Sequence, residues 1–156
     1  MSKVRKEKNS LMTMVTLIVI GLIAGSILAG LLKIVQVLSG NEAYPLLFNM
    51  DYIPLLKQWN DVTGAGYIFH YVTCIASVIF LFYLLRQFSW QYKIWPYIAL
   101  FGAGGGALYF LSALTEAKPA PDDFFAWLCW TVGHFIFGYV SGRLIQFIHQ
   151  FKGGDI

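Results

Sequence analysis

The sequence predicts an all-α membrane protein in which four transmembrane helices form one bundle. Four long apolar runs carry this prediction, since each is about as long as a helix must be to cross a ~30 Å hydrocarbon core. The composition agrees, because 58% of the residues are hydrophobic and 12% are charged, against about 25% charged in soluble domains. The spans are expected at about 11–33, 64–85, 94–115 and 124–146.

The first span also has features of a secretory signal peptide. Basic residues precede its apolar core, and Ala24 and Ser26 offer a small-residue cleavage site, as in such peptides. The run is longer than the apolar core of a signal peptide, and it carries a stripe of small residues that includes Gly21 and Gly25. We therefore interpret it as an uncleaved membrane anchor.

The connection after the first span, from Ser39 to Asp61, is rich in aromatic and aliphatic residues. Asp51 is suited to cap a helix, Pro54 suits a first helical turn, and Trp59 then shares a side with the neighbouring leucines. We expect a short interfacial helix lying in the outer headgroup layer.

The third span contains the glycine-rich stretch Phe101–Ala107. It does not match a phosphate-binding loop, because no strand precedes it and no Gly-Lys-Ser/Thr follows. Consecutive glycines lower helix propensity, so a local bend or a crowded helix crossing is expected.

The spans use most of the 156 residues. We expect one membrane domain over 1–156, with short loops and no globular extramembrane enzyme. The sequence holds no His-Glu-x-x-His, Gly-x-Ser-x-Gly or comparable catalytic pattern, so no enzymatic activity and no cofactor are expected.

The distribution of Lys and Arg predicts that both termini are cytoplasmic, because cations concentrate in cytoplasmic loops. The net charge of +3 is then an orientation signal and does not indicate a nucleic-acid partner. The basic amino terminus is suited to contact anionic lipid. Cations of the predicted inner side are Lys3, Arg5, Lys6, Lys8, Arg86, Lys93, Arg143 and Lys152. Anions of the predicted outer side are Glu42, Asp51, Asp61, Glu116, Asp122 and Asp123.

Small residues recur at every fourth position in three of the spans, which allows helix backbones to approach closely in a membrane. We expect these positions to pack the bundle, and a homo-oligomer interface is the alternative use. The glycines concerned are Gly21, Gly25, Gly102, Gly106, Gly138 and Gly142.

Polar side chains form a stripe on the second span, where His70, Thr73, Cys74 and Ser77 share one helix face. His134 of the fourth span lies at a depth that allows the two histidines to meet. Such a cluster would respond to pH, because histidine titrates near ~6.5. The alternative is that each histidine bonds a neighbouring backbone and holds helices together. The full candidate cluster is His70, Cys74, Ser77, Tyr109, Glu116 and His134.

Metal binding is not expected. His70 and Cys74 share a face, but a closed site needs further ligands. Cys129 points away from His134, because five residues turn the helix by roughly 140°. The two cysteines lie in apolar spans and do not indicate a disulfide framework.

Three segments carry a resemblance to a known family: IGLIAGSILAGLLK (20–33), KIWPYIALFGAGGGA (93–107) and TVGHFIFGYVSGRLI (131–145). With the His-led second span, they make the chain resemble the YagU-like family of bacterial inner-membrane proteins, whose molecular role is not established. The resemblance implies an inner-membrane location and carries over His70 and His134. Some relatives have another histidine in the third span, where this chain has Tyr109 and Phe110, and an acidic residue one turn before the Gly-His, where it has Trp130.

Two functional classes remain open from the sequence. The absence of charge in the middle of the spans favours a structural or interaction protein that contributes to envelope homeostasis. The alternative is a small pH-responsive transporter or channel component that uses His70 and His134, with an unspecified small molecule or ion as substrate.

Overall fold

The computed structural model describes residues 2–115 and 119–151, with side chains from Ser10 onward. Four long helical segments dominate it, and each is long and apolar enough to cross a membrane, the third of them (Ile94–Leu114) being an α-helix continued by a 3-10 segment. The expected all-helical architecture with four helices long and apolar enough to cross a membrane is confirmed, and the described residues contain no strand. The long helices are α1 (Ser2–Ser39), α3 (Ala65–Arg86), α4 (Ile94–Leu108) and α5 (Phe124–Phe151). The short ones are α2 (Ala43–Leu46) and the 3-10 segments η1 (Lys57–Trp59) and η2 (Tyr109–Leu114).

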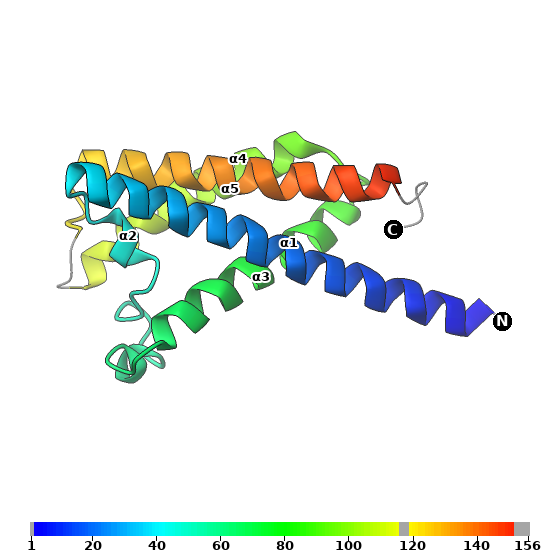
Figure 1. Ribbon diagram of the computed structural model, residues 1–156, viewed down its shortest axis with the longest axis horizontal. Helices are drawn as coiled ribbons and strands as arrows, with labels where there is room; N and C mark the ends of the chain where they lie inside the picture. Colours follow the sequence, from blue (N-terminus) through cyan, green and yellow to red (C-terminus); the bar gives the residue numbers. More distant parts are fainter. Residues whose placement is uncertain (1, 116–118, 152–156) are drawn as a thin grey trace.

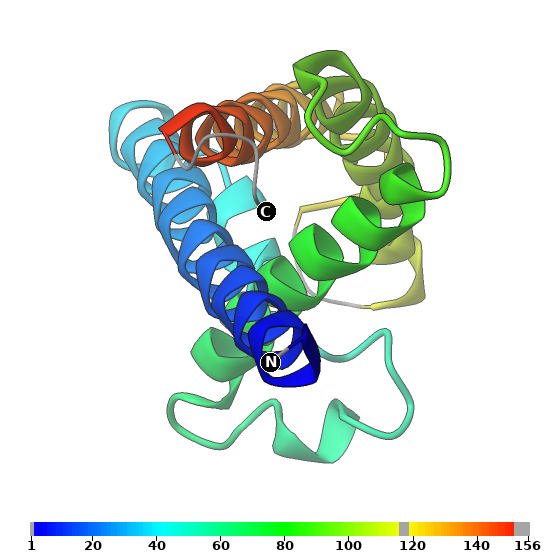
Figure 2. The same ribbon diagram turned by 90° about the vertical axis from the view of Figure 1, so that its right-hand side faces the viewer.

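The long helices form two packed pairs. α4 lies along α5, α1 crosses α3, and α1 also packs against α5 and so joins the pairs. α3 diverges from α4 and α5 toward the end of the molecule that carries the connection between α1 and α3 (Figure 1). Viewed end-on, the four helices surround a common centre (Figure 2). The start of α1 and the end of α5 lie at the opposite end from that connection.

Glycines set the close approach of α4 to α5. A Cβ at Gly138 would collide with the backbone carbonyl of Tyr97, and a Cβ at Gly142 would lie 3.1 Å from the Cα of Ile94. On the other helix, a Cβ at Gly102 would enter the ring of Phe135. These contacts leave no room for larger side chains, which accounts for glycine at the crossing.

The crossing of α1 with α3 has the same basis. A Cβ added at Gly21 would lie 2.7 Å from the Cα of Ile75, and one at Gly25 would lie 3.0 Å from the Cys74 Sγ. At the other crossing, Gly106 of α4 likewise faces Thr131 of α5. All six glycines of the predicted stripes therefore lie against another helix of the same chain.

The third span begins as an α-helix and tightens into the 3-10 segment η2 at Tyr109, one turn after the glycines. The Tyr109 hydroxyl donates to the carbonyl oxygens of Ala120 at 2.8 Å and Asp123 at 3.2 Å. These bonds attach the end of the span to the beginning of α5. Asp123 itself caps α5, because its Oδ1 accepts the Ala126 N–H at 2.9 Å.

We predict that Tyr109→Phe lowers the free energy of unfolding by about 1 kcal/mol, since a single hydroxyl loses its hydrogen bonds while the ring packing stays. Thermal unfolding of the purified protein in detergent measures the effect. Tyr139→Phe is the matched control, because Tyr139 is 51% exposed on α5. Equal melting temperatures for both variants would contradict the role given to the Tyr109 hydroxyl.

The connection between α1 and α3 folds back against the bundle instead of remaining outside it. Leu46, Leu47 and Met50 are buried among the spans. The connection contains the four-residue helix α2, and over the segment 51–59, where the sequence placed a short helix, it has turns followed by the 3-10 turn η1; its position relative to a headgroup layer stays a prediction. Asp51 caps no helix there, and its N–H donates to Asn49 Oδ1 at 2.9 Å. Local asparagine bonds of this kind favour turns over helix.

Candidate functional site

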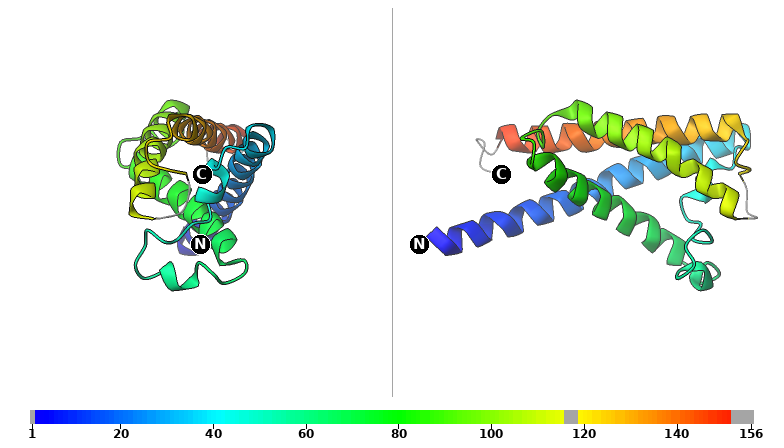
Figure 3. Two further views of the ribbon diagram at one scale, coloured as in Figure 1. Left: turned by 90° about the vertical axis from the view of Figure 1, so that its left-hand side faces the viewer. Right: turned by 180° about the vertical axis from the view of Figure 1, so that it is seen from behind.

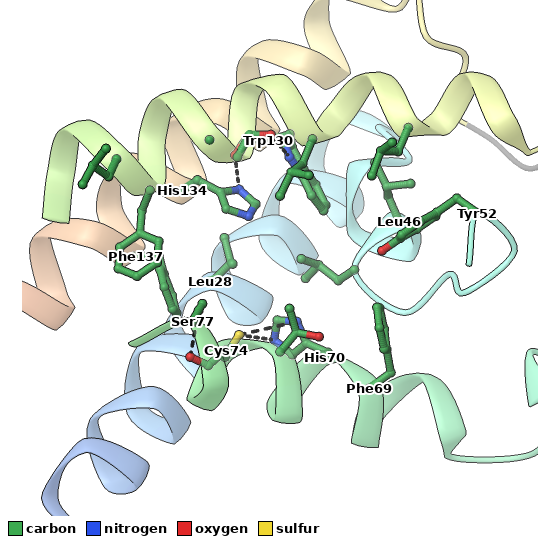
Figure 4. A pocket seen from close by; sticks show the side chains of 18 of the residues that line it. Leu28, Leu46, Tyr52, Phe69, His70, Cys74, Ser77, Trp130, His134 and Phe137 are labelled. Atoms are coloured by element: carbon green, nitrogen blue, oxygen red, sulfur yellow. Dashed lines mark hydrogen bonds between the residues drawn. The ribbon is translucent and has the colours of Figure 1, made fainter. Parts of the chain in front are cut away.

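α3 diverges from α4 and α5 along its length (Figure 3). A cavity of about 490 Å³ is lined by residues of these helices, of α1 and of the connection after α1. Most of the side chains that line the cavity are apolar. Its volume is within the range of small-molecule sites, about 300–1,000 Å³. The polar stripe of α3 forms one wall with His70, Thr73, Cys74 and Ser77, and α5 forms the facing wall with Trp130, His134 and Phe137 (Figure 4).

His70 is fixed against α1. Its Nε2 lies 3.2 Å from the carbonyl oxygen of Gly25, which can only accept, so this nitrogen carries a proton and donates. The thiol of Cys74 lies 3.8 Å from the same ring, one helical turn away. The absence of a side chain at Gly25 makes room for Cys74, because a Cβ there would lie 3.0 Å from the Cys74 Sγ and 3.1 Å from the Cys74 Cβ.

His134 is fixed by its own helix and by α4. Its Nδ1 lies 2.8 Å from the Trp130 carbonyl oxygen and donates to it. Its ring lies 4.6 Å from the Trp130 ring, centroid to centroid. The Trp130 Nε1 in turn donates to the Gly105 carbonyl at 2.8 Å. A Cβ at Gly105 would occupy the position of the imidazole, so glycine at 105 makes room for the histidine.

The structure brings four of the six candidate residues to one cavity: His70, Cys74, Ser77 and His134. The two histidines lie on facing walls, and no hydrogen bond joins their rings within the described structure. Tyr109 is not among the lining residues and bonds the connection before α5 instead. Glu116 lies outside the described residues.

Sequence reasoning did not identify Trp130, Gly104 and Gly105 as parts of the site. The spacing of Trp130 and His134, one helical turn apart, was a usable signal, because such residues share a face. The glycines carried no signal of their own, since a glycine beside a cavity and a glycine at a helix crossing look alike in sequence.

Among the residues that the structure describes, none of those lining the cavity is Asp, Glu, Lys or Arg. Tyr52, at the outer end of the cavity, stays a neutral phenol because burial raises its pKa. A charged molecule would thus find no counter-ion, and burying an unpaired charge is costly. Among the described residues, no three His, Cys, Asp or Glu side chains are grouped to hold a metal ion. Cys74 and Cys129 are both free thiols.

The cavity opens between α3 and α4. Thr73 on α3 and Gly104 on α4 are lining residues that are also exposed. Leu100 and Leu108 of α4 line the cavity with exposed fractions of 49% and 58%. These residues belong to the apolar spans, so in a membrane the opening faces lipid acyl chains.

The structure is a helical bundle with four helices long and apolar enough to cross a membrane and a cavity between them. Comparisons with protein-family models, curated proteins and solved structures find no match for it.

Proposed function

We propose that this protein binds a small, largely apolar molecule in the cavity between its spans and acts as a membrane-embedded carrier or sensor of that molecule. The observation that carries the proposal is the cavity itself, with a histidine on each of two facing walls and an opening toward lipid. The sequence left open a structural protein and a small pH-responsive transporter or channel component, and this proposal favours the second. A pH response of the histidines stays a prediction.

The size of the cavity supports an occupant, because an unfilled space between packed helices costs free energy that rises with its volume. The opening between α3 and α4 gives a molecule dissolved in the bilayer access to this space. The retained volume of about 490 Å³ therefore favours a binding role.

We further propose that the protein resides in a bacterial inner membrane with both termini in the cytoplasm. The bias of Lys and Arg supports this orientation, as does the resemblance to the YagU-like family. The first residues of α1 and the last of α5 lie at the same end of the bundle (Figure 1). Under the proposed orientation, that end faces the cytoplasm.

Reporter fusions test the orientation. Green fluorescent protein fused after Ile156 is expected to fluoresce, because it folds in the cytoplasm. Alkaline phosphatase fused after Asp61 is expected to be active, because it needs the periplasm. The reverse pattern, a dark carboxyl-terminal fusion with an inactive phosphatase, would contradict the proposed orientation.

Photoaffinity labelling tests the binding function. The full chain in lipid nanodiscs is irradiated with an octanol that carries a diazirine, and the labelled residues are mapped by mass spectrometry. We expect labels on cavity-lining segments of α3 and α4 that disappear when unlabelled octanol is added. Labels on lipid-facing side chains serve as the internal control, because diffuse contact with lipid does not saturate. A pattern without any competed position would overturn the binding proposal.

A further inference from the structure

We infer that the molecule bound in the cavity is a neutral amphiphile with an apolar body and a hydroxyl group, an alcohol or a phenol, whose hydroxyl donates a hydrogen bond to Nε2 of His134. This inference rests on the proposed binding function and adds the chemical class of the ligand. The observation behind it is that no described residue donates a hydrogen bond to Nε2 of His134, which can only accept.

The protonation of His134 follows from its hydrogen bond. Because Nδ1 donates to the Trp130 carbonyl oxygen at 2.8 Å, the neutral ring keeps its lone pair on Nε2, which then acts only as an acceptor. No described residue donates to this nitrogen. Figure 4 shows the imidazole projecting into the cavity toward the wall formed by α3.

Three side-chain donors near His134 or on the facing wall are already engaged, and no hydrogen bond joins the lining hydroxyls of Tyr52 and Thr73 to His134 in the described structure. The Trp130 Nε1 donates to the Gly105 carbonyl at 2.8 Å. Across the cavity, His70 Nε2 donates to the Gly25 carbonyl at 3.2 Å, and the Ser77 hydroxyl donates to the Cys74 carbonyl at 2.9 Å. An acceptor left unpaired in an apolar site is unfavourable, so the arrangement favours an occupant that brings its own donor.

The other lining residues indicate the polarity and charge of the rest of the ligand. Leu28, Phe69 and Phe137 surround the space with hydrocarbon, which suits an apolar body. The described part of the lining carries no charged side chain, which disfavours amines and carboxylates in their ionised forms. The acceptor at His134 Nε2 suits one hydroxyl, whereas Nδ1 of His70, the other ring nitrogen left to accept, lies 3.8 Å from the Cys74 thiol.

The depth of His134 in the membrane favours a free amphiphile over a membrane phospholipid as the molecule that donates the hydrogen bond. His134 lies about 15 Å along α5 from Phe124, at a rise of ~1.5 Å per residue, and thus near the middle of a ~30 Å hydrocarbon core. At that depth a phospholipid presents only its acyl chains, which have no hydrogen-bond donor. An alcohol that enters between α3 and α4 carries its donor with it.

Competition between two matched molecules tests the inference. In the photolabelling assay on nanodiscs, 1-octanol and its methyl ether are compared as competitors, with concentrations expressed as mole fraction in the bilayer. The ether keeps the apolar body and removes the donor. We expect octanol to compete at an about three- to tenfold lower mole fraction, the range that one neutral hydrogen bond provides.

Substitution of the acceptor completes the test. His134→Phe keeps a ring of similar size and removes both nitrogens, so the advantage of octanol over the ether is expected to vanish. His149→Phe is the matched control and should keep the advantage, because His149 stacks on Tyr92 and is not a lining residue. Equal competition by both molecules in the native chain, or an advantage that persists in His134→Phe, would overturn the inference.

A second measurement needs no variant and covers the case in which His134→Phe does not fold. With ¹⁵N-labelled histidine in the native chain, octanol is expected to shift the Nε2 resonance of His134, and the ether is expected to leave it unchanged. A resonance that responds equally to both molecules contradicts the inference. If both molecules compete saturably and equally, the binding function is supported and only the inferred ligand class is wrong. If neither molecule competes, both the binding function and the ligand class are wrong.

Discussion

Gly138→Val is expected to separate α4 from α5 and to leave little folded protein after detergent extraction. A Cβ at this position meets the carbonyl oxygen of Tyr97, and it would lie 2.8 Å from the carbonyl carbon of Tyr97 and 2.9 Å from the Cα of Ile98. These are backbone atoms, so no side-chain rotation relieves the collision. Overpacking of a core typically costs about 1–3 kcal/mol, and a branched side chain against a helix backbone should reach or exceed the upper end.

Gly30→Val is the matched control for this prediction. Gly30 is also a helical glycine, but a Cβ there has no neighbour within 4 Å and the position is exposed on α1. Both variants change helix propensity in the same way, so only the crossing differs. Size-exclusion chromatography with thermal unfolding compares them. If the two variants elute and melt alike, the close approach of α4 and α5 at Gly138 is not essential to the fold.

Gly104→Leu is expected to abolish competed photolabelling in the cavity while leaving the bundle folded. Gly104 lines the cavity, and a Cβ there would meet nothing within 4 Å. A leucine at this position therefore fills space that the ligand would otherwise use, without touching a packed helix. We expect at least a tenfold loss of labelling and an unchanged or higher melting temperature, because replacing a helical glycine gains about 0.5–1 kcal/mol.

Gly30→Leu provides the comparison, since it adds the same side chain at an open position of α1 that does not line the cavity. Labelling of Gly30→Leu should match that of the native chain. Undiminished labelling of Gly104→Leu would show that the competed positions lie elsewhere, and a lower melting temperature would show that the space beside Gly104 is not open in solution.

The membrane spans were predictable from sequence because length and hydropathy are local properties. The spacing of small residues also indicated positions for close packing, and the glycines of the stripes do face neighbouring helices. Spacing gives the face of a helix but not its partner. Gly21 and Gly25 therefore did not reveal that α1 crosses α3 at Ile75 and Cys74.

The candidate site was predictable only in part. The α3 stripe and His134 were found because polar groups in apolar spans are conspicuous. Tyr109 was grouped with them by depth alone, whereas its hydroxyl reaches the backbone of Ala120, eleven residues along the chain. The cavity itself arises from the angle between α3 and α4, which no local pattern encodes. The connection after α1 was also difficult, because its buried leucines depend on the surface that the spans leave open.

The packing of α3 has a mechanical consequence. This helix is held chiefly through its crossing with α1, whereas α4 is packed along α5. The distance between α3 and α4 thus depends mainly on one crossing angle, and lateral pressure from the surrounding acyl chains acts to reduce it. A molecule bound between α3 and α4 opposes that pressure and keeps the two helices apart. The area that the protein occupies in the plane of the membrane is therefore coupled to what its interior contains.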